Sequence, residues 1–288
     1  MDWSRAPRLM DNPSSLPRHV PRRPQKHEPD PLPMSFTSLN RRVRASGLHF
    51  LLSVLVAAVV SLLIFWVWYP APYSAIAGGF SLFVLLVSVD VVLGPALTAV
   101  AASPTKPLPE LRRDLALIVL IQLAAFVYGI HTIAVARPVY LSFEIDRLRV
   151  VTANDIDPEA LDAAPAELQA LPWTGPKMIA AVKPTDANEL LRSIDLGLAG
   201  FDLSMVPKNW RPYASSKDAA WAKARPVSVL IARYPAMREE VEKAARDTGQ
   251  PLDGLRFLPL VSRHANWVGL LAAPDARLVG YVPVDGFF

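Results

Sequence analysis

Few side chains in this sequence have the types and spacing that enzyme chemistry requires. The chain contains no cysteine, which excludes disulfides and thiolate metal sites. The single histidine in its second half is His264, and the nearby Ser262 does not sit in the nucleophile-elbow pattern G-x-S-x-G. The acidic run Glu239, Glu240 and Glu242 is interpreted as a solvated helix face, and no glycine-rich phosphate loop is present. We therefore expect no catalytic residue, no cofactor and no bound metal.

One polar cluster is notable because it falls inside apolar segments. Asp90 is the only carboxylate within such a segment, and burying a carboxylate in lipid is costly. Counted at the helical rise, Gln122 and Ser53 lie at nearly the same depth in two other apolar segments. We expect Asp90 to face the interior of a helix bundle and to form a hydrogen bond with Gln122. Two interpretations stay open: these side chains hold the helices together, or they receive a proton or a polar group from a partner helix.

Three apolar segments must position this cluster. They cover about 47–68, 77–100 and 115–136, and each is long enough to cross about 30 Å of hydrocarbon. Hydrophobic residues make up 52% of the 288 residues and charged residues 19%, below the quarter or so that is typical of soluble domains. The sequence therefore predicts a membrane protein with three transmembrane helices. The pair Gly94-Pro95 is expected to kink the second helix or to let a neighbour approach closely.

Lysine and arginine residues indicate how these helices are oriented. Basic residues precede the first helix and lie between the second and the third, whereas the loop 69–75 carries no charge. They are Arg41, Arg42, Arg44, Lys106, Arg112 and Arg113. The positive-inside rule places the N-terminus in the cytoplasm and everything after residue 137 in the periplasm of a bacterial inner-membrane protein. Because the net charge of +4 comes from these flanks, we expect no nucleic-acid partner.

The ends of the first helix differ in character. Residues 1–46 are predicted to be a disordered cytoplasmic tail, because they are rich in proline and arginine. Met34 is a second candidate for the native start, in which case residues 1–33 are an upstream extension. At the other end, aromatic residues are expected to form a belt at the membrane surface. They are Trp66, Trp68, Tyr69 and Tyr73.

Residues 138–288 are too polar to cross a membrane and are predicted to form a small α+β domain. Strands are predicted at 147–152, 178–182, 227–234, 256–261, 267–272 and 278–284, the last two joined by a turn at 273–276. Helices are predicted at 157–171 (interrupted by Pro165), at 186–193 with Asp186 as N-cap, and at 235–248 with Gly249 as the stop. A candidate patch for binding a partner protein consists of Trp210, Arg211, Tyr213 and Trp267.

Several motifs in the chain resemble those of a known family. The segment WVWYPAPY at 66–73 includes Trp68, Tyr69, Pro70, Pro72 and Tyr73, and VDVVLGPALT at 89–98 includes Gly94 and Pro95. The third helix adds Lys106, Asp114, Gln122, Tyr128, Gly129, Arg137 and Pro138, and looser matches follow at 201–213, in ARPVSVL and at 258–285. Together these motifs cover nearly the whole chain after Met34. The chain resembles the type IV pilin accessory proteins of the TfpX/TfpZ kind, which are also grouped as FimB-like.

The resemblance implies an assembly role without chemistry of its own. Such proteins are encoded beside particular pilins and support the assembly or surface display of those pilins. The hypothesis is that this protein binds a type IV pilin through its helices and its periplasmic domain, with inner-membrane lipid and the pilus assembly platform as further partners. Two alternatives are kept: a membrane enzyme that modifies pilin, for example by glycosyl transfer, and a sensor of a periplasmic ligand.

Overall fold

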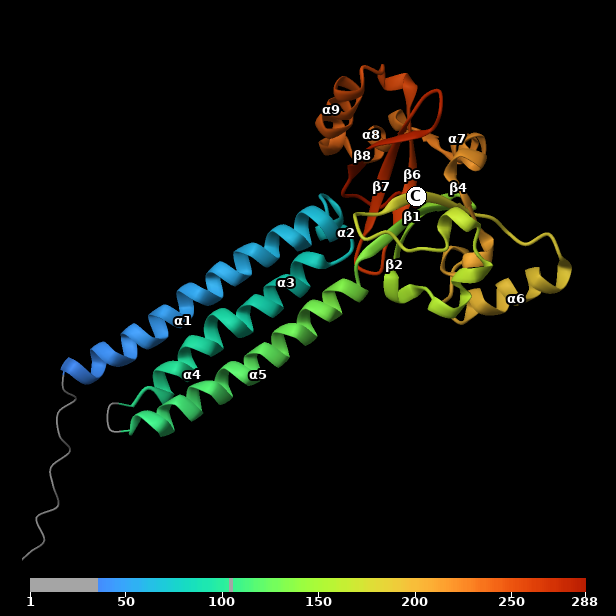
Figure 1. The fold of residues 1–288 in the computed structure, drawn as a ribbon. Helices are drawn as coiled ribbons and strands as arrows, with labels where there is room; N and C mark the ends of the chain where they lie inside the picture. Colours follow the sequence, from blue (N-terminus) through green and yellow to red (C-terminus); the bar gives the residue numbers. More distant parts are fainter. Residues whose placement is uncertain (1–35, 104–105) are drawn as a thin grey trace, which may run out of the picture.

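The computed structural model describes residues 36–103 and 106–288 of the chain, and Figure 1 shows their arrangement. Three long helices lie side by side at one end of the molecule, and a sheet domain follows at the other end. The predictions made for residues 1–35, including the alternative start at Met34, lie outside the described residues.

The three long helices match the apolar segments of the sequence. The first is α1 (Phe36–Leu62), which continues as the π-helical segment η1 (Leu63–Trp68). The second consists of α3 (Gly79–Ser88), the π-helical segment η2 (Val89–Leu93) and α4 (Gly94–Ala101), and the third is α5 (Leu108–Val135). Within them Val43–Trp68, Gly79–Ala101 and Leu108–Val135 are long and apolar enough to cross a membrane. The predicted fold, with three transmembrane helices before an α+β domain, is confirmed.

The first and third helices extend beyond their apolar segments. Residues 36–46, predicted as part of a disordered tail, belong to α1. The helix α5 begins at Leu108 with Pro109 in its first turn, so Arg112 and Arg113 lie in the helix and not in a loop. A helix satisfies its own backbone hydrogen bonds whether its side chains are apolar or charged, which is why it continues past the lipid.

The second span changes its geometry at Gly94-Pro95. Pro95 has no N–H to donate to a carbonyl of the preceding turn, and that turn is the π-helical segment η2. Gly94 has no side chain, and a Cβ at this position would collide with Nε2 of Gln122 on α5. The expected close approach of a neighbouring helix is confirmed.

The domain is built on one mixed sheet of eight strands, in the order β4-β3-β1-β2-β6-β7-β8, with β5 paired to β6. The pairs β1–β3 and β2–β6 are parallel, and the other pairs are antiparallel. The strands are β1 (Pro138–Glu144), β2 (Arg147–Thr152), β3 (Lys177–Ala181), β4 (Trp210–Pro212), β5 (Arg225–Pro226), β6 (Leu255–Val261), β7 (Asn266–Ala272) and β8 (Arg277–Val282). The third membrane helix therefore leads directly into a central strand.

Helices and short 3-10 turns surround the sheet. The α-helices are α2 (Tyr73–Ile76), α6 (Ala187–Leu198), α7 (Lys217–Lys223), α8 (Val227–Arg233) and α9 (Arg238–Thr248). The 3-10 turns are η3 (Ala153–Asp155), η4 (Pro158–Ala163), η5 (Ala166–Leu168), η6 (Leu203–Met205), η7 (Pro207–Asn209), η8 (Tyr213–Ser216), η9 (Pro235–Met237) and η10 (Leu252–Gly254). As predicted, Asp186 caps α6 by accepting the N–H groups of Asn188 and Glu189, and α9 ends at Gly249 with a φ of 65°.

Two predictions of local structure are wrong, and one strand was missed. The segment 227–234 was predicted as a strand but forms α8, because Val227, Leu230 and Ile231 are spaced to bury one helical face. The predicted helix at 157–171 is replaced by the 3-10 turns η4 and η5 on either side of Pro165. Strand β1, in which all seven residues are buried, was not predicted, because it follows α5 after only two residues and no loop marks its start.

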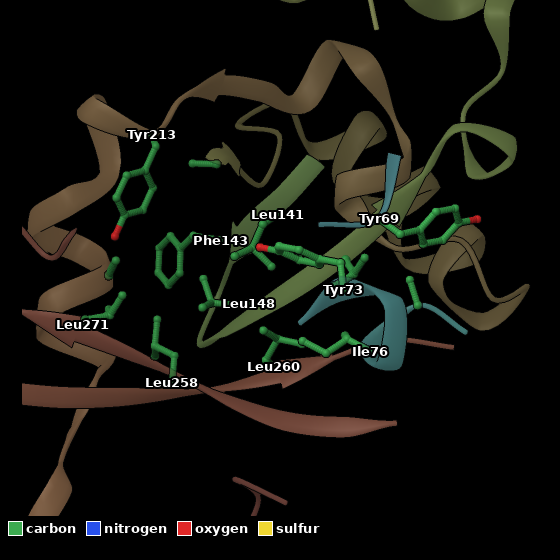
Figure 2. Close-up of a cluster of buried hydrophobic side chains, with 14 of the residues drawn as sticks. Tyr69, Tyr73, Ile76, Leu141, Phe143, Leu148, Tyr213, Leu258, Leu260 and Leu271 are labelled. Atoms are coloured by element: carbon green, nitrogen blue, oxygen red, sulfur yellow. The ribbon is translucent and has the colours of Figure 1, made fainter. Parts of the chain in front are cut away.

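The largest hydrophobic core joins the membrane helices to the sheet. It contains Tyr69, Tyr73 and Ile76 from the connection between the first two spans, together with sheet residues such as Leu141 and Leu260. Figure 2 shows these side chains in one cluster, although they come from segments far apart in the sequence. A second core lies between the sheet and the helices α8 and α9, and a third lies around Trp210.

Candidate partner-binding site

Side chains from all three membrane helices line one cavity in the bundle. The helices α1 and α5 each pack against the second span and scarcely against each other. The cavity between them has a volume of about 220 Å³, and its polar lining residues are His49, Ser53, Asp90 and Gln122. Its apolar lining residues are Leu52, Val56, Ala57, Val60, Leu86, Val87, Val119, Leu123 and Phe126. The structure thus brings together the three polar residues that the sequence singled out.

Two acceptor atoms of this cluster have no partner. Within the described residues, Oδ1 of Asp90 and Oε1 of Gln122 are buried and unbonded. Asp90 is the middle residue of the span Gly79–Ala101, where a charged side chain costs about 2.5–3.5 kcal/mol. No hydrogen bond joins Asp90 to Gln122 in this part of the chain, so that prediction is wrong. The amide of Gln122 instead lies over Gly94, about one helical turn beyond Asp90.

A second polar contact, at the edge of the cavity, fixes α1 against α4. Nδ1 of His49 lies 2.6 Å from Oγ1 of Thr98, which is 3% exposed. Sequence reasoning missed both residues, because it compared only side chains at the depth of Asp90, and His49 and Thr98 lie near the ends of their apolar segments. The signal was present, since His49 and Ser53 are four residues apart on one helical face, as are Gly94 and Thr98.

Asp90 also borders a second cavity, of about 290 Å³, between the second span and α5. Tyr128 and Gly129 of the family-like motif line this cavity. A Cβ at Gly129 would lie 2.5 Å from Cδ1 of Leu86, so glycine permits the close packing of α3 on α5. Asp90 therefore lies between two cavities in the bundle, both lined mainly by apolar side chains.

The connection between the first two spans is docked onto the sheet. Oη of Tyr73 lies 2.5 Å from Oη of Tyr281 on β8, and the hydroxyl of Ser262 donates to the carbonyl of Ile76 at 2.5 Å. Burial raises the pKa of both tyrosines, so this pair stays protonated at neutral pH. Gly78 has a φ of +74°, and a Cβ there would lie 2.7 Å from the ring of His264. Backbone shape and side chains together seat this connection on the domain.

The same connection is also bonded to α5 and to the loop before β3. The hydroxyl of Tyr69 donates to the carbonyl of Ile133 at 3.1 Å, near the end of α5. The N–H of Gly175 donates to the carbonyl of Val67 at 2.7 Å, and a Cβ at Gly175 would meet Pro70. Each membrane helix thus ends in a contact that holds the domain in place.

Arg137 and Pro138 stand where α5 passes into the sheet. The guanidinium of Arg137 donates to the carbonyl of Ala134 at 2.7 Å and lies 4.6 Å from the ring of Trp173. Pro138 begins β1. The junction between membrane and domain is therefore a short, bonded segment.

The predicted aromatic belt is wrong for three of its four residues. Trp66 is 81% exposed, in keeping with a lipid-facing position, but Trp68, Tyr69 and Tyr73 are buried. An aromatic ring with a polar tip suits a membrane surface and a protein core equally well. Here the domain covers this end of the bundle and takes the rings into its core.

The predicted patch of Trp210, Arg211, Tyr213 and Trp267 does not form one surface. Trp210 is fully buried, and its indole N–H donates to the carbonyl of Ser204 at 2.8 Å. The hydroxyl of Tyr213 donates to the carbonyl of Ala276 at 2.7 Å inside the main core. Two of the four side chains therefore offer no exposed face to a partner.

A different part of the domain exposes apolar side chains. The helix α6 projects from the domain away from the membrane helices (Figure 1), and none of its residues is buried. Leu191, Ile194 and Leu198 are 61%, 53% and 85% exposed and share one helical face. An amphipathic helix usually buries such a face, so this one is a candidate contact surface.

Both ends of the α6 segment are anchored to the domain. At its start, Glu189 pairs with Lys208 at 3.0 Å. Beyond its end, Asp202 pairs with Arg149 of β2 at 2.5 Å. Oε2 of the buried Glu144 accepts the N–H of Ser204 at 3.1 Å, and burial raises the pKa of this carboxyl.

The described residues contain no group of three or more histidine and carboxylate side chains that could hold a metal ion. Ser262 and His264 both serve the docked connection: the hydroxyl of Ser262 is bonded to the carbonyl of Ile76, and the ring of His264 packs against Gly78. What the described residues present is a pair of unpaired hydrogen-bond acceptors in the bundle and an apolar face on α6.

Comparison with known proteins points to one family. The profile of the fimbrial assembly protein FimB matches residues 37–78, which contain α1 and the docked connection. No solved structure matches the chain. The chain is 37% identical over 246 residues to the fimbrial assembly protein of serogroup I from Dichelobacter nodosus, an alignment that covers 85% of this chain and 95% of that protein.

Two further relatives from Dichelobacter nodosus agree. The serogroup E1 fimbrial assembly protein is 35% identical over 246 residues, with the same coverage of 85% and 95%. The fimbrial assembly protein of serogroups C1 and C2 is 50% identical over 113 residues, which cover 39% of this chain and 86% of that protein. With relatives matched over nearly their whole length, the chain belongs to the FimB family of fimbrial assembly proteins.

Proposed function

We propose that the protein is an inner-membrane escort for a type IV pilin, which it binds through both its helix bundle and its sheet domain. Membership of the fimbrial assembly family gives it a role in pilus assembly. The distribution of Lys106, Arg112 and Arg113 supports a cytoplasmic N-terminus and a periplasmic domain.

The observation that carries the proposal is the docking of the domain on the membrane helices. The bonds of Tyr73 and Ile76 hold the connection between the first two spans on the sheet domain, and the bond of Tyr69 holds the same connection to α5. Pilins have one apolar membrane helix and a globular head in the periplasm. A partner of that shape would meet the bundle with its helix and the domain with its head at the same time.

The exposed face of α6 supports a contact between the domain and the pilin head. Leu191, Ile194 and Leu198 form the apolar part of this face, which no other part of the described chain covers. Its anchored ends hold it in place for a partner to dock on.

Photo-crosslinking in cells tests the proposal. A photoreactive amino acid is placed at Leu191 on α6 and, in separate strains, at Val56 in the bundle, with an epitope-tagged type IV pilin expressed beside it. We expect pilin adducts from both positions and a lower pilin level when the gene is deleted. Absence of every adduct, with an unchanged pilin level, would reject an escort role.

A mass measurement separates an escort from an enzyme that modifies pilin. Intact pilin purified with and without the protein is weighed by mass spectrometry. We expect identical masses, because an escort binds pilin without changing its covalent structure. A mass difference equal to a sugar would replace the escort by a glycosyl transferase.

A further inference from the structure

We propose that the cavity between α1 and α5 is the seat of the pilin membrane helix, and that this helix supplies a hydrogen-bond donor or a positive charge to Asp90 and Gln122. This inference rests on the function proposed above and names the subsite that would carry the membrane half of the interaction.

The shape of the bundle leaves a place for one more helix. The first and third helices pack on the second span and scarcely on each other, so the second span forms the floor of a groove. Val56 on one wall and Val119 and Leu123 on the other are 38%, 55% and 56% exposed. A fourth helix laid between these walls would cover their apolar side chains and complete a four-helix arrangement.

The residues at the floor of the groove determine which chemical group that helix must supply. Oδ1 of Asp90 and Oε1 of Gln122 are both acceptors, and neither has a partner within the described residues. A carboxyl oxygen without its proton and an amide oxygen are acceptors, and both are satisfied by donors: an ammonium, a guanidinium, an N–H or a hydroxyl. A lipid chain would cover the walls but would leave both oxygens unbonded.

The position of the acceptors selects a transmembrane partner. Asp90 is the middle residue of Gly79–Ala101, and Gln122 is one of the two middle residues of Leu108–Val135. A donor must therefore reach the centre of the membrane, which requires a side chain on a helix that itself spans the lipid. A cavity of about 220 Å³ holds one such side chain, while the rest of the helix lies over its mouth.

Other residues hold Asp90 and Gln122 in the lining of this space. Gly94 lets the amide of Gln122 lie against the second span, and the bond between His49 and Thr98 holds α1 in place beside it. Ser53 lines the same wall as His49 and adds a hydroxyl that could share the donor. The arrangement joins three helices around one point.

Crosslinking at matched positions tests the seat. Val56 lines the cavity, whereas Val59, on the same helix and 61% exposed, does not. With a photoreactive residue at one or the other position in the full-length protein, co-expressed tagged pilin should form adducts at Val56 and at most a background amount at Val59. Equal adducts at both positions, or adducts with lipid alone at Val56, would overturn the seat.

Changes to the acceptors test the chemistry. Asp90→Leu removes the carboxylate, and Asp90→Asn keeps its shape but replaces one acceptor with a donor. Each should lower the Val56 adduct about tenfold, the loss expected for one charge-assisted hydrogen bond. Because leucine is more favourable than aspartate within a membrane helix, Asp90→Leu should not lower the protein level. The Leu191 adduct on α6 reports whether the domain is intact.

The outcomes separate this inference from the proposed function. Adducts from Leu191 that persist while Val56 gives none would overturn the seat and leave pilin binding in place. A Val56 adduct that survives Asp90→Leu, Asp90→Asn and Gln122→Leu would overturn the role of the acceptors. Absence of pilin adducts at every position would overturn both the seat and the escort function.

Discussion

Oη of Tyr73 and Oη of Tyr281 lie 2.5 Å apart, which joins the connection between the first two membrane helices to the last strand of the sheet. The two rings also meet edge to face, with centroids 5.5 Å apart. Among the described residues this pair spans one of the largest sequence separations of any hydrogen bond, and it couples bundle and domain together with the bond between Ser262 and Ile76.

Tyr73→Phe and Tyr281→Phe should each lower the free energy of unfolding by about 1–3 kcal/mol, because each leaves the other hydroxyl buried without its partner. The double variant should cost less than the sum of the two. Unfolding in detergent, followed by tryptophan fluorescence, measures this difference. Tyr128→Phe, at a position that is 73% exposed, is the control, and strictly additive effects would show that the two hydroxyls are not coupled.

Gly78→Ala should loosen the docked connection. Its φ of +74° disfavours any residue with a Cβ, and the new methyl group would meet the ring of His264. We expect a loss of about 1–3 kcal/mol in the same unfolding measurement. Gly47→Ala is a matched control, because no atom lies within 4 Å of a Cβ at that position. A Gly78→Ala protein as stable as the Gly47→Ala protein would contradict the docking geometry.

Leu191→Ser should weaken pilin association without weakening the fold. The side chain is 61% exposed, so its loss should change the free energy of unfolding by no more than about 0.5 kcal/mol. Co-purification of tagged pilin is the readout, and we expect a several-fold decrease. Arg192→Ser, one residue further along α6, is the control. If both variants retain pilin equally well, the α6 face is not the contact.

Glu144 should make the stability of the domain depend on pH. Burial raises its pKa in the folded state above the value of about 4.3 in an unfolded chain. Its contribution to stability is therefore fully present below that unfolded value and is lost as the pH rises through the raised folded pKa. We expect the wild-type protein to gain more stability than Glu144→Gln as the pH falls from neutral. The exposed Glu167→Gln serves as control, and parallel pH curves for wild type and Glu144→Gln would refute the assignment.

The membrane helices could be predicted from sequence because their signal is additive along the chain. Long apolar segments predicted three helices, and short runs of strand-forming residues predicted β2, β3, β6, β7 and β8 close to their observed bounds. Strand β1 was missed because it follows α5 after only Ala136 and Arg137, so that no loop separates it from the helix. The helix α8 was mistaken for a strand because its valine and isoleucine residues have high strand propensity.

The candidate site shows a different limit. The common depth of Ser53, Asp90 and Gln122 could be counted from the sequence, and the structure places them around one cavity. The sequence could not predict which atoms pair. The π-helical segment η2 and the contact of Gln122 with Gly94 depend on how the helices rotate against each other. The burial of Trp68 and Tyr73 could not be predicted either, because aromatic side chains with a polar group suit a membrane surface as well as a protein core.

The docked connection has a consequence for biosynthesis. Tyr73 and Ile76 complete the core formed by Leu141, Leu148 and Leu260, so residues 138–288 on their own lack one wall of their core. Tyr73 and Ile76 precede all the strands in the sequence, so they are synthesised first and reach the membrane with the first two helices before the strands are made. A fragment cut free of its helices would expose apolar side chains of this core and aggregate, whereas the full-length chain already contains the covering residues when its strands fold.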